Sequence, residues 1–161
     1  MNENLTRILK IGSYVALFFC ACWFVYLFYQ SYHHAFDTTG NYIHWEAKYT
    51  LVCFVSILFF LYNLLTIALI ATCSWFFINL IKGIRQEEPF PKINVMIVFV
   101  SSILIFLQTI ASDNYDQIFL SEGPAVIEVT SNPFVQALVL IVFGVIYKIA
   151  SQVAAEHDLT V

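Results

Sequence analysis

The sequence predicts an all-α integral membrane protein, a transmembrane bundle of four helices. The chain is 60% hydrophobic and only 11% charged, whereas soluble domains usually carry about 25% charged residues. Four long apolar stretches have no ionisable residue in their interiors, and they cover 11–29, 49–80, 93–111 and 134–150. A helix crosses a bilayer with about 20 mostly apolar residues. The segments between the stretches are too short for a soluble domain, so we expect one membrane domain over residues 1–161.

The boundaries follow from the same pattern. We expect the spans at about 11–32, 49–80, 93–111 and 133–154. The loops 33–48 and 112–132 then lie on one side, and the loop 81–92 lies on the other. The second stretch is longer than a bilayer requires, so it should tilt strongly or project beyond the membrane. The first stretch is longer than the apolar region of a secretory signal, and we expect it to be retained as a span.

Basic residues predict the orientation. Six of the seven Lys and Arg fall on the side of the termini and the middle loop, namely Arg7, Lys10, Lys82, Arg85, Lys92 and Lys148. Lys48 is the exception. Loops rich in Lys and Arg stay in the cytoplasm. Both termini and the loop 81–92 are therefore expected inside.

Polar groups within the spans are uncharged. The absence of deep ionisable residues argues against a pump, a voltage sensor or a proton-coupled transporter. The remaining polar side chains are expected to form hydrogen bonds between helices, and they are Asn63, Thr66, Thr72, Ser74, Ser101, Ser102, Gln108 and Gln136. Gly12, Ala16 and Cys20 form a row of small residues that would permit close helix approach, and Gly144 would do the same in the fourth span.

Histidines and acids of the first outer loop are weak candidates for a metal site. They are His33, His34, Asp37 and His44, and imidazole and carboxylate groups bind zinc well. Their spacing matches no recognised site, however, and a solvated loop at the headgroups is the simpler interpretation. We expect no cofactor.

Four cysteines are present, at positions 20, 22, 53 and 73. Cys20 and Cys22 point about 200° apart on a helix, so they cannot hold a metal from one face. Core packing is the main interpretation of all four. A thiol couple between Cys20 and Cys73, which lie at similar depth, remains open.

Catalytic motifs are missing from the sequence. It has no nucleotide-binding loop, nucleophile elbow or zinc-protease helix, and no basic patch large enough to bind nucleic acid directly. We therefore expect a non-enzymatic protein. A small membrane redox or lipid-modifying enzyme that uses span cysteines is the weaker alternative.

Two cytoplasmic segments stand out. Pro89 and Pro91 bracket Phe90 and prevent a simple helical hairpin, so that Phe90 either docks back under the helices or faces a partner. The C-terminal segment, Glu156–Val161, is polar and then apolar at its end.

These segments resemble a family of small bacterial four-span membrane proteins, domain of unknown function 2975. Its members carry a Gly-x-Pro-Phe-like turn and a Lys/Asn pair before the third span, which corresponds here to Glu88–Asn94 (EPFPKIN). They also end in an acidic stretch that closes with Leu-Thr-Val or Leu-Thr-Ile, here Glu156–Val161 (EHDLTV). Members are often encoded beside a small helix-turn-helix regulator. The resemblance implies membrane-linked transcriptional control in the bacterial inner membrane.

The leading hypothesis is a signalling or sequestration protein that holds a small cytoplasmic DNA-binding regulator. The candidate partner-binding residues are Lys82, Arg85, Glu87, Glu88, Pro89, Phe90, Lys92, Asn94, Glu156, Asp158, Leu159, Thr160 and Val161. The alternative is an accessory or assembly subunit of a larger membrane complex. Besides the lipid bilayer, the expected partners are thus a regulator or other membrane subunits.

Overall fold

Four long α-helices make up the structure, a computed structural model that describes residues 3–35, 52–86, 88, 90–120 and 129–158. The helices are α1 (Glu3–Ala35), α2 (Val52–Arg85), α3 (Ile93–Leu120) and α4 (Asn132–Asp158). Each contains a segment long and apolar enough to cross a membrane, namely Thr6–His33, Ile57–Arg85, Ile93–Asn114 and Asn132–Ala155. The predicted all-helical fold with four apolar helices is confirmed.

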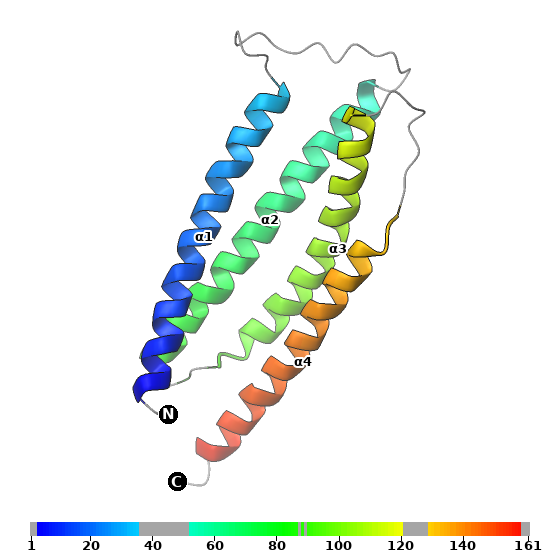
Figure 1. Cartoon of the computed structure of the whole chain (residues 1–161). Coiled ribbons are helices and arrows are strands. Elements are labelled where there is room, and N and C mark those ends of the chain that lie inside the picture. Colours follow the sequence, from blue (N-terminus) through cyan, green and yellow to red (C-terminus); the bar gives the residue numbers. More distant parts are fainter. Residues whose placement is uncertain (1–2, 36–51, 87, 89, 121–128, 159–161) are drawn as a thin grey trace.

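The helices stand side by side in chain order and form an open row (Figure 1). α1 packs on α2, α2 on α3, and α3 on α4. Within the described ranges the backbone of α1 approaches neither α3 nor α4, so the row does not close into a ring around one core. α1 and α4 are therefore edge helices, each with a broad face open to the surroundings.

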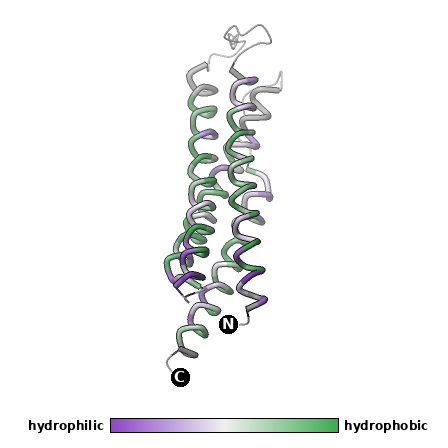
Figure 2. The backbone as a smooth tube through the Cα atoms, turned by 90° about the vertical axis from the view of Figure 1, so that its left-hand side faces the viewer, coloured by the Kyte–Doolittle hydropathy of each residue, from purple (hydrophilic) through white to green (hydrophobic). Residues whose placement is uncertain are grey.

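Both termini and the connection between α2 and α3 lie at the same end of the row (Figure 1). Hydrophilic residues gather toward this end, while hydrophobic ones cover most of each helix (Figure 2). We call it the basic end, because Arg7, Lys10, Lys82, Arg85 and Lys92 lie there. α2 continues to Arg85, so Lys82 and Arg85, which we expected in the loop 81–92, occupy its last turn. Basic residues are favoured at that position by the helix dipole, and no proline interrupts the helix before residue 89.

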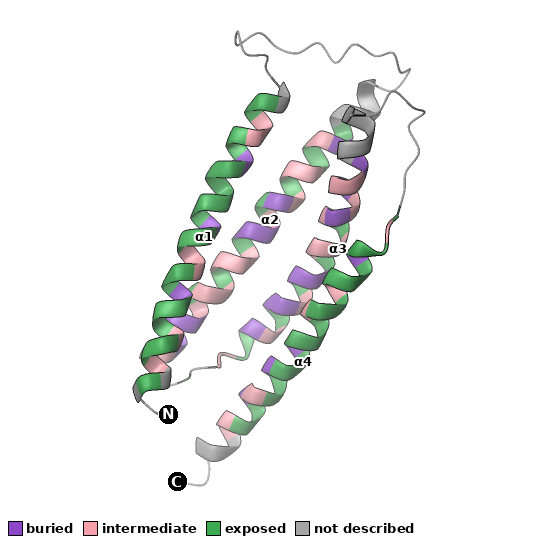
Figure 3. Cartoon of the chain, viewed as in Figure 1, coloured by how far each residue is buried: buried purple, intermediate pink, exposed green. Residues whose placement is uncertain are grey.

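The buried surface of α1 is narrow. Ser13, Cys20 and Leu27 recur every seven residues and are buried, whereas most of their neighbours are exposed (Figure 3). Cys20 and Leu27 form one apolar cluster with Ile70 of α2. A single stripe of this kind can pack against one neighbour only, which explains why α1 joins the row at its edge.

Hydrogen bonds between side chains link neighbouring helices, as predicted for the polar groups of the spans. The Ser101 hydroxyl donates to Thr72 Oγ1 at 3.2 Å, and Gln108 Nε2 donates to Thr66 Oγ1 at 3.4 Å, both between α3 and α2. Further bonds join Ser31 to Asn63 (α1 to α2) and Thr109 to Gln136 (α3 to α4). The prediction of interhelical bonding is thus confirmed for Asn63, Thr66, Thr72, Ser101, Gln108 and Gln136.

Gly144 and Gly12 differ in how closely another helix approaches them. A Cβ atom added to Gly144 would lie 3.2 Å from Val98 Cγ1, so this glycine lets α4 approach α3 closely, as predicted. At Gly12 a Cβ atom would meet nothing within 4 Å. The predicted close approach at Gly12 is therefore wrong, because the buried stripe of α1 passes through the next residue, Ser13.

This difference gives a matched pair of variants. Gly144→Leu should destabilise the protein by about 1–3 kcal/mol, because the larger side chain overpacks the contact with Val98. Gly12→Leu should cost nothing, because its side chain enters open space. Thermal unfolding of both variants in the same detergent, followed by circular dichroism, measures the effect. Equal losses of stability would contradict the described α3–α4 contact.

Candidate functional site

The connection between α2 and α3, at the basic end, is held by several backbone hydrogen bonds. They lie at both sides of the connection. The amides of Gln86 and Glu88 donate to the Gly83 carbonyl at 3.0 and 2.9 Å. At the other side the Asn94 amide donates to the Pro91 carbonyl at 3.0 Å. The connection is thus a tight structure fixed to the ends of both helices.

Gly83 makes this tight turn possible. A Cβ atom at this position would lie 2.2 Å from the Glu88 carbonyl oxygen and 2.6 Å from Pro91 Cγ. Both distances are far below van der Waals contact, and the Glu88 oxygen belongs to backbone. The connection can therefore fold back over α2 only with glycine at position 83.

Phe90 docks under the helices, which is one of the two arrangements left open by the sequence. Its ring packs edge-on against Tyr147 of α4, with 5.7 Å between ring centroids and 72° between planes. Its carbonyl oxygen accepts a hydrogen bond from the Ser151 hydroxyl at 3.1 Å. Two contacts to α4, one aromatic and one polar, therefore hold the middle of the connection.

Asn94 joins three helices. Its side chain is fully buried, with 0% of its surface exposed. Nδ2 donates to the Phe76 carbonyl of α2 at 3.1 Å and to the Tyr147 hydroxyl of α4 at 3.3 Å. Oδ1 has no hydrogen-bond partner among the described atoms. The Phe76 ring packs against Tyr147 at 5.5 Å, so the same residues also meet through apolar contacts. Asn94, a candidate for partner contact, thus acts within the fold.

Charged side chains surround this fixed connection. Lys82, Arg85, Glu88 and Lys92 are all exposed. A cavity of about 390 Å³ lies between the connection and the end of α4. Its lining residues are Glu88, Phe90, Pro91, Lys92, Ile93, Ser151, Ala154 and Ala155. The connection therefore lines a hollow whose surface is partly apolar and partly polar, with Glu88 and Lys92 among the lining residues.

The other candidate partner-binding residues are only partly described. Glu156 and Asp158 belong to the last turn of α4, but their side chains lie outside the described part of the structure. Glu87, Pro89 and the segment 159–161 also lie outside it. The structure thus brings together Glu88, Phe90, Lys92 and Asn94.

The histidine candidates for a metal site are not assembled in the described residues. His33 packs against the rings of Tyr29 and Tyr32, at 4.4 and 5.9 Å between centroids. Asp37, His44 and the His34 side chain lie outside the described residues. No group of three or more His, Cys, Asp or Glu suited to a metal occurs in the ranges that the structure describes.

The cysteines separate into two environments. Cys73 packs against the cluster that contains Cys20, whereas Cys22 is exposed on another face of α1. The prediction that Cys20 and Cys22 do not share a face is confirmed. Apolar surroundings disfavour the thiolate, which is the reactive form of cysteine, so the contact between Cys73 and the Cys20 cluster fits core packing. The Cys53 side chain is not among those described.

The chain matches no protein-family model, no curated protein and no solved structure. The resemblance to domain of unknown function 2975 therefore stays a prediction that rests on two short segments.

Several residues that build this site were not candidates in the sequence. Gly83, Tyr147 and Ser151 hold the connection in place, yet each lies within or beside an apolar stretch where such residues are common. The spacing of Gly83 before the two prolines was the one available signal, since a glycine ahead of a tight reversal permits close backbone approach.

Removal of the Asn94 contacts should be measurable. Asn94→Ala should destabilise the protein by about 2 kcal/mol, because two hydrogen bonds are lost. Tyr147→Phe should cost about 1 kcal/mol, since it removes one bond and keeps the ring contacts. Tyr26→Phe, at an exposed position of α1, is the control and should stay within about 0.5 kcal/mol of wild type. Chemical unfolding in detergent gives these values, and a Tyr147→Phe variant as stable as the control would refute the bond.

Proposed function

We propose that this chain is a multi-pass protein of the bacterial inner membrane, with both termini and the α2–α3 connection in the cytoplasm. Four helices of sufficient length and apolar composition support the membrane location. Six of the seven basic residues lie toward one end, and the positive-inside rule assigns that end to the cytoplasm. The exposed aliphatic and aromatic side chains that cover α1 and α4 would then face lipid.

In this orientation the protein acts as a non-enzymatic signalling or sequestration protein. It holds a small cytoplasmic helix-turn-helix regulator at the basic end, through the α2–α3 connection and the C-terminal segment. The observation that carries this proposal is the fixed connection itself. Hydrogen bonds to the Gly83 carbonyl, from the Asn94 amide and from the Ser151 hydroxyl hold its backbone. Lys82, Arg85, Glu88 and Lys92 remain exposed around it. A preformed surface of this kind binds a partner without paying for loop ordering.

Release of the regulator follows from the same contacts. The connection is attached to α2 through Gly83 and to α4 through Tyr147 and Ser151. A membrane or envelope signal that moves α4 relative to α2 would separate these attachments and change the presented surface. The regulator would then leave the membrane and act on its target genes.

A second candidate is an accessory or assembly subunit of a larger membrane complex. The open row favours it, because α1 contacts only α2 within the described ranges and leaves its other face uncovered. A further transmembrane helix from another subunit would fit against such an edge. Under this proposal the partner lies within the membrane and not at the α2–α3 connection.

One copurification experiment with the variant Gly83→Ala distinguishes the two proposed functions. The added methyl group displaces the connection by clashing with Glu88 and Pro91, although it removes none of the candidate contact side chains. Gly12→Ala is the matched control, since nothing lies near its Cβ position. Both variants are purified with a tag from native membranes in mild detergent, and bound proteins are identified by mass spectrometry.

We expect a small DNA-binding protein to copurify with wild type and Gly12→Ala, and to fall at least about tenfold with Gly83→Ala. A DNA-binding protein retained equally by Gly83→Ala would contradict a role of the connection. Membrane subunits retained by all three proteins would instead support the accessory role. Circular dichroism of Gly83→Ala checks that the helices remain formed.

A further inference from the structure

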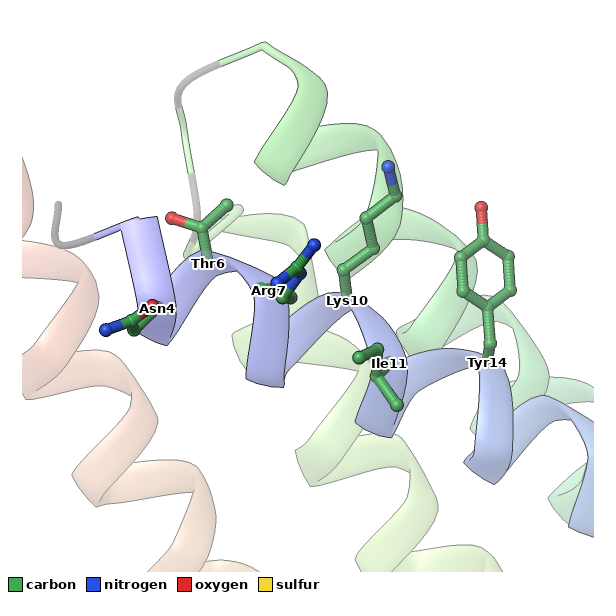
Figure 4. Close-up of a pocket in the computed structure, with 6 residues that line it drawn as sticks. All are labelled: Asn4, Thr6, Arg7, Lys10, Ile11 and Tyr14. Carbon is green, nitrogen blue, oxygen red and sulfur yellow. The ribbon is translucent and has the colours of Figure 1, made fainter.

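A second set of basic residues at the basic end belongs to α1 and not to the α2–α3 connection. A hollow of about 550 Å³ is lined by Asn4, Thr6, Arg7, Lys10, Ile11 and Tyr14. All six come from the first turns of α1, and the Thr6, Arg7, Lys10 and Tyr14 side chains project toward the same side (Figure 4). Residues three, four and seven apart on a helix lie on one face, so the arrangement follows from the sequence spacing.

The charged side chains described at this hollow are both basic. Arg7 and Lys10 are exposed, and the structure assigns neither of them an ion-pair partner among the described side chains. Among the described side chains that line the hollow, none is acidic. The phenol of Tyr14 adds a hydrogen-bonding group one turn beyond Lys10. The guanidinium of Arg7, the ammonium of Lys10 and the hydroxyl of Tyr14 suit a phosphate group.

The surroundings of the hollow are apolar on one side. Beyond it, toward the middle of α1, Ile11, Val15 and Phe18 are 57%, 48% and 65% exposed. They follow one another at spacings of four and three residues, so they form a stripe that continues from the hollow along the helix. α1 packs only on α2 within the described ranges, and this stripe is not buried in that contact. A phosphate at Arg7 and Lys10 would thus sit at the start of an exposed apolar track.

The depth of these residues also fits a bilayer. The apolar segment of α1 begins at Thr6, which places Arg7 and Lys10 at the level of the headgroups if α1 spans the membrane. Tyr14 then lies at the boundary where aromatic residues with a polar tip are enriched. Basic residues at this depth are attracted to anionic lipids on the cytoplasmic side.

We propose that Arg7, Lys10 and Tyr14 form a binding site for the phosphate of an anionic phospholipid, whose acyl chain runs along Ile11, Val15 and Phe18. The lipid is preferred to a free phosphate because the charged hollow and the apolar stripe are continuous on one helix. The inference uses the membrane location proposed above, and it is independent of the regulator and of the α2–α3 connection. The site would anchor the edge helix of the row to lipids of one charge.

The test uses purified full-length protein in a neutral detergent. A fluorescent phosphatidylglycerol is titrated onto it, and phosphatidylcholine with the same chains serves as the reference lipid. The double variant R7Q/K10Q is compared with K82Q/R85Q, which removes the same amount of charge from the last turn of α2. Circular dichroism confirms that each variant is folded.

We expect wild type to prefer phosphatidylglycerol. Each basic side chain near an anionic lipid contributes about fivefold in affinity, so R7Q/K10Q should lose about 25-fold and K82Q/R85Q less than about threefold. The preference should also fall as salt is added, because exposed charges are screened.

Three results would overturn the proposal. Wild type without a preference between the two lipids would show that no such site exists. Equal losses in both double variants would assign the preference to the total charge of the basic end. Competition by glycerol phosphate at the same concentration as the lipid would show that the acyl chain contributes nothing, and that the hollow binds a soluble phosphate.

Discussion

The amide of Asn94 is the interaction on which the basic end depends. It lies fully buried at the start of α3 and donates to the Phe76 carbonyl of α2 and to the Tyr147 hydroxyl of α4. A buried polar group costs free energy unless it is hydrogen-bonded, and the cost is highest where no water is available. Both bonds of Nδ2 are therefore maintained only when α2, α3 and α4 keep their relative positions. The bond from Asn94 to the Tyr147 hydroxyl also positions the Tyr147 ring, against which the Phe90 ring packs.

The open row has a different physical origin. Each neighbouring pair of helices is joined by polar bonds between side chains, such as Ser101 to Thr72 between α3 and α2. Gly144 lets α4 approach α3 closely. In the ranges that the structure describes, α1 contacts only α2. α1 is therefore held in place by fewer contacts than the other three helices. α2, α3 and α4 are tied together at the basic end, whereas α1 is attached along a single stripe. A row of this form separates the fixed surface of the basic end from an edge helix whose outer face is uncovered.

The sequence predicted what depends on local composition and missed what depends on distant contacts. Four apolar stretches predicted four helices, and polar residues such as Gln108 and Thr66 were expected to bond across helices because an apolar environment leaves them few other partners. The bonds of Asn94 to Tyr147 and of Ser151 to Phe90 join residues 53 and 61 positions apart. Which of many span residues meet at such distances depends on helix rotation, and composition does not determine it. Gly12 is a further example, because helix rotation places the neighbouring Ser13, and not Gly12, in the buried stripe of α1.

The described part of the α2–α3 connection is a fixed structure and not a flexible loop. Amide hydrogen exchange of the wild-type protein in lipid nanodiscs tests this most directly. The amides of Glu88 and Asn94 donate to the carbonyls of Gly83 and Pro91, so both should exchange much more slowly than amides of an unstructured chain. Exchange of these amides at the rate of an unstructured peptide would contradict the account.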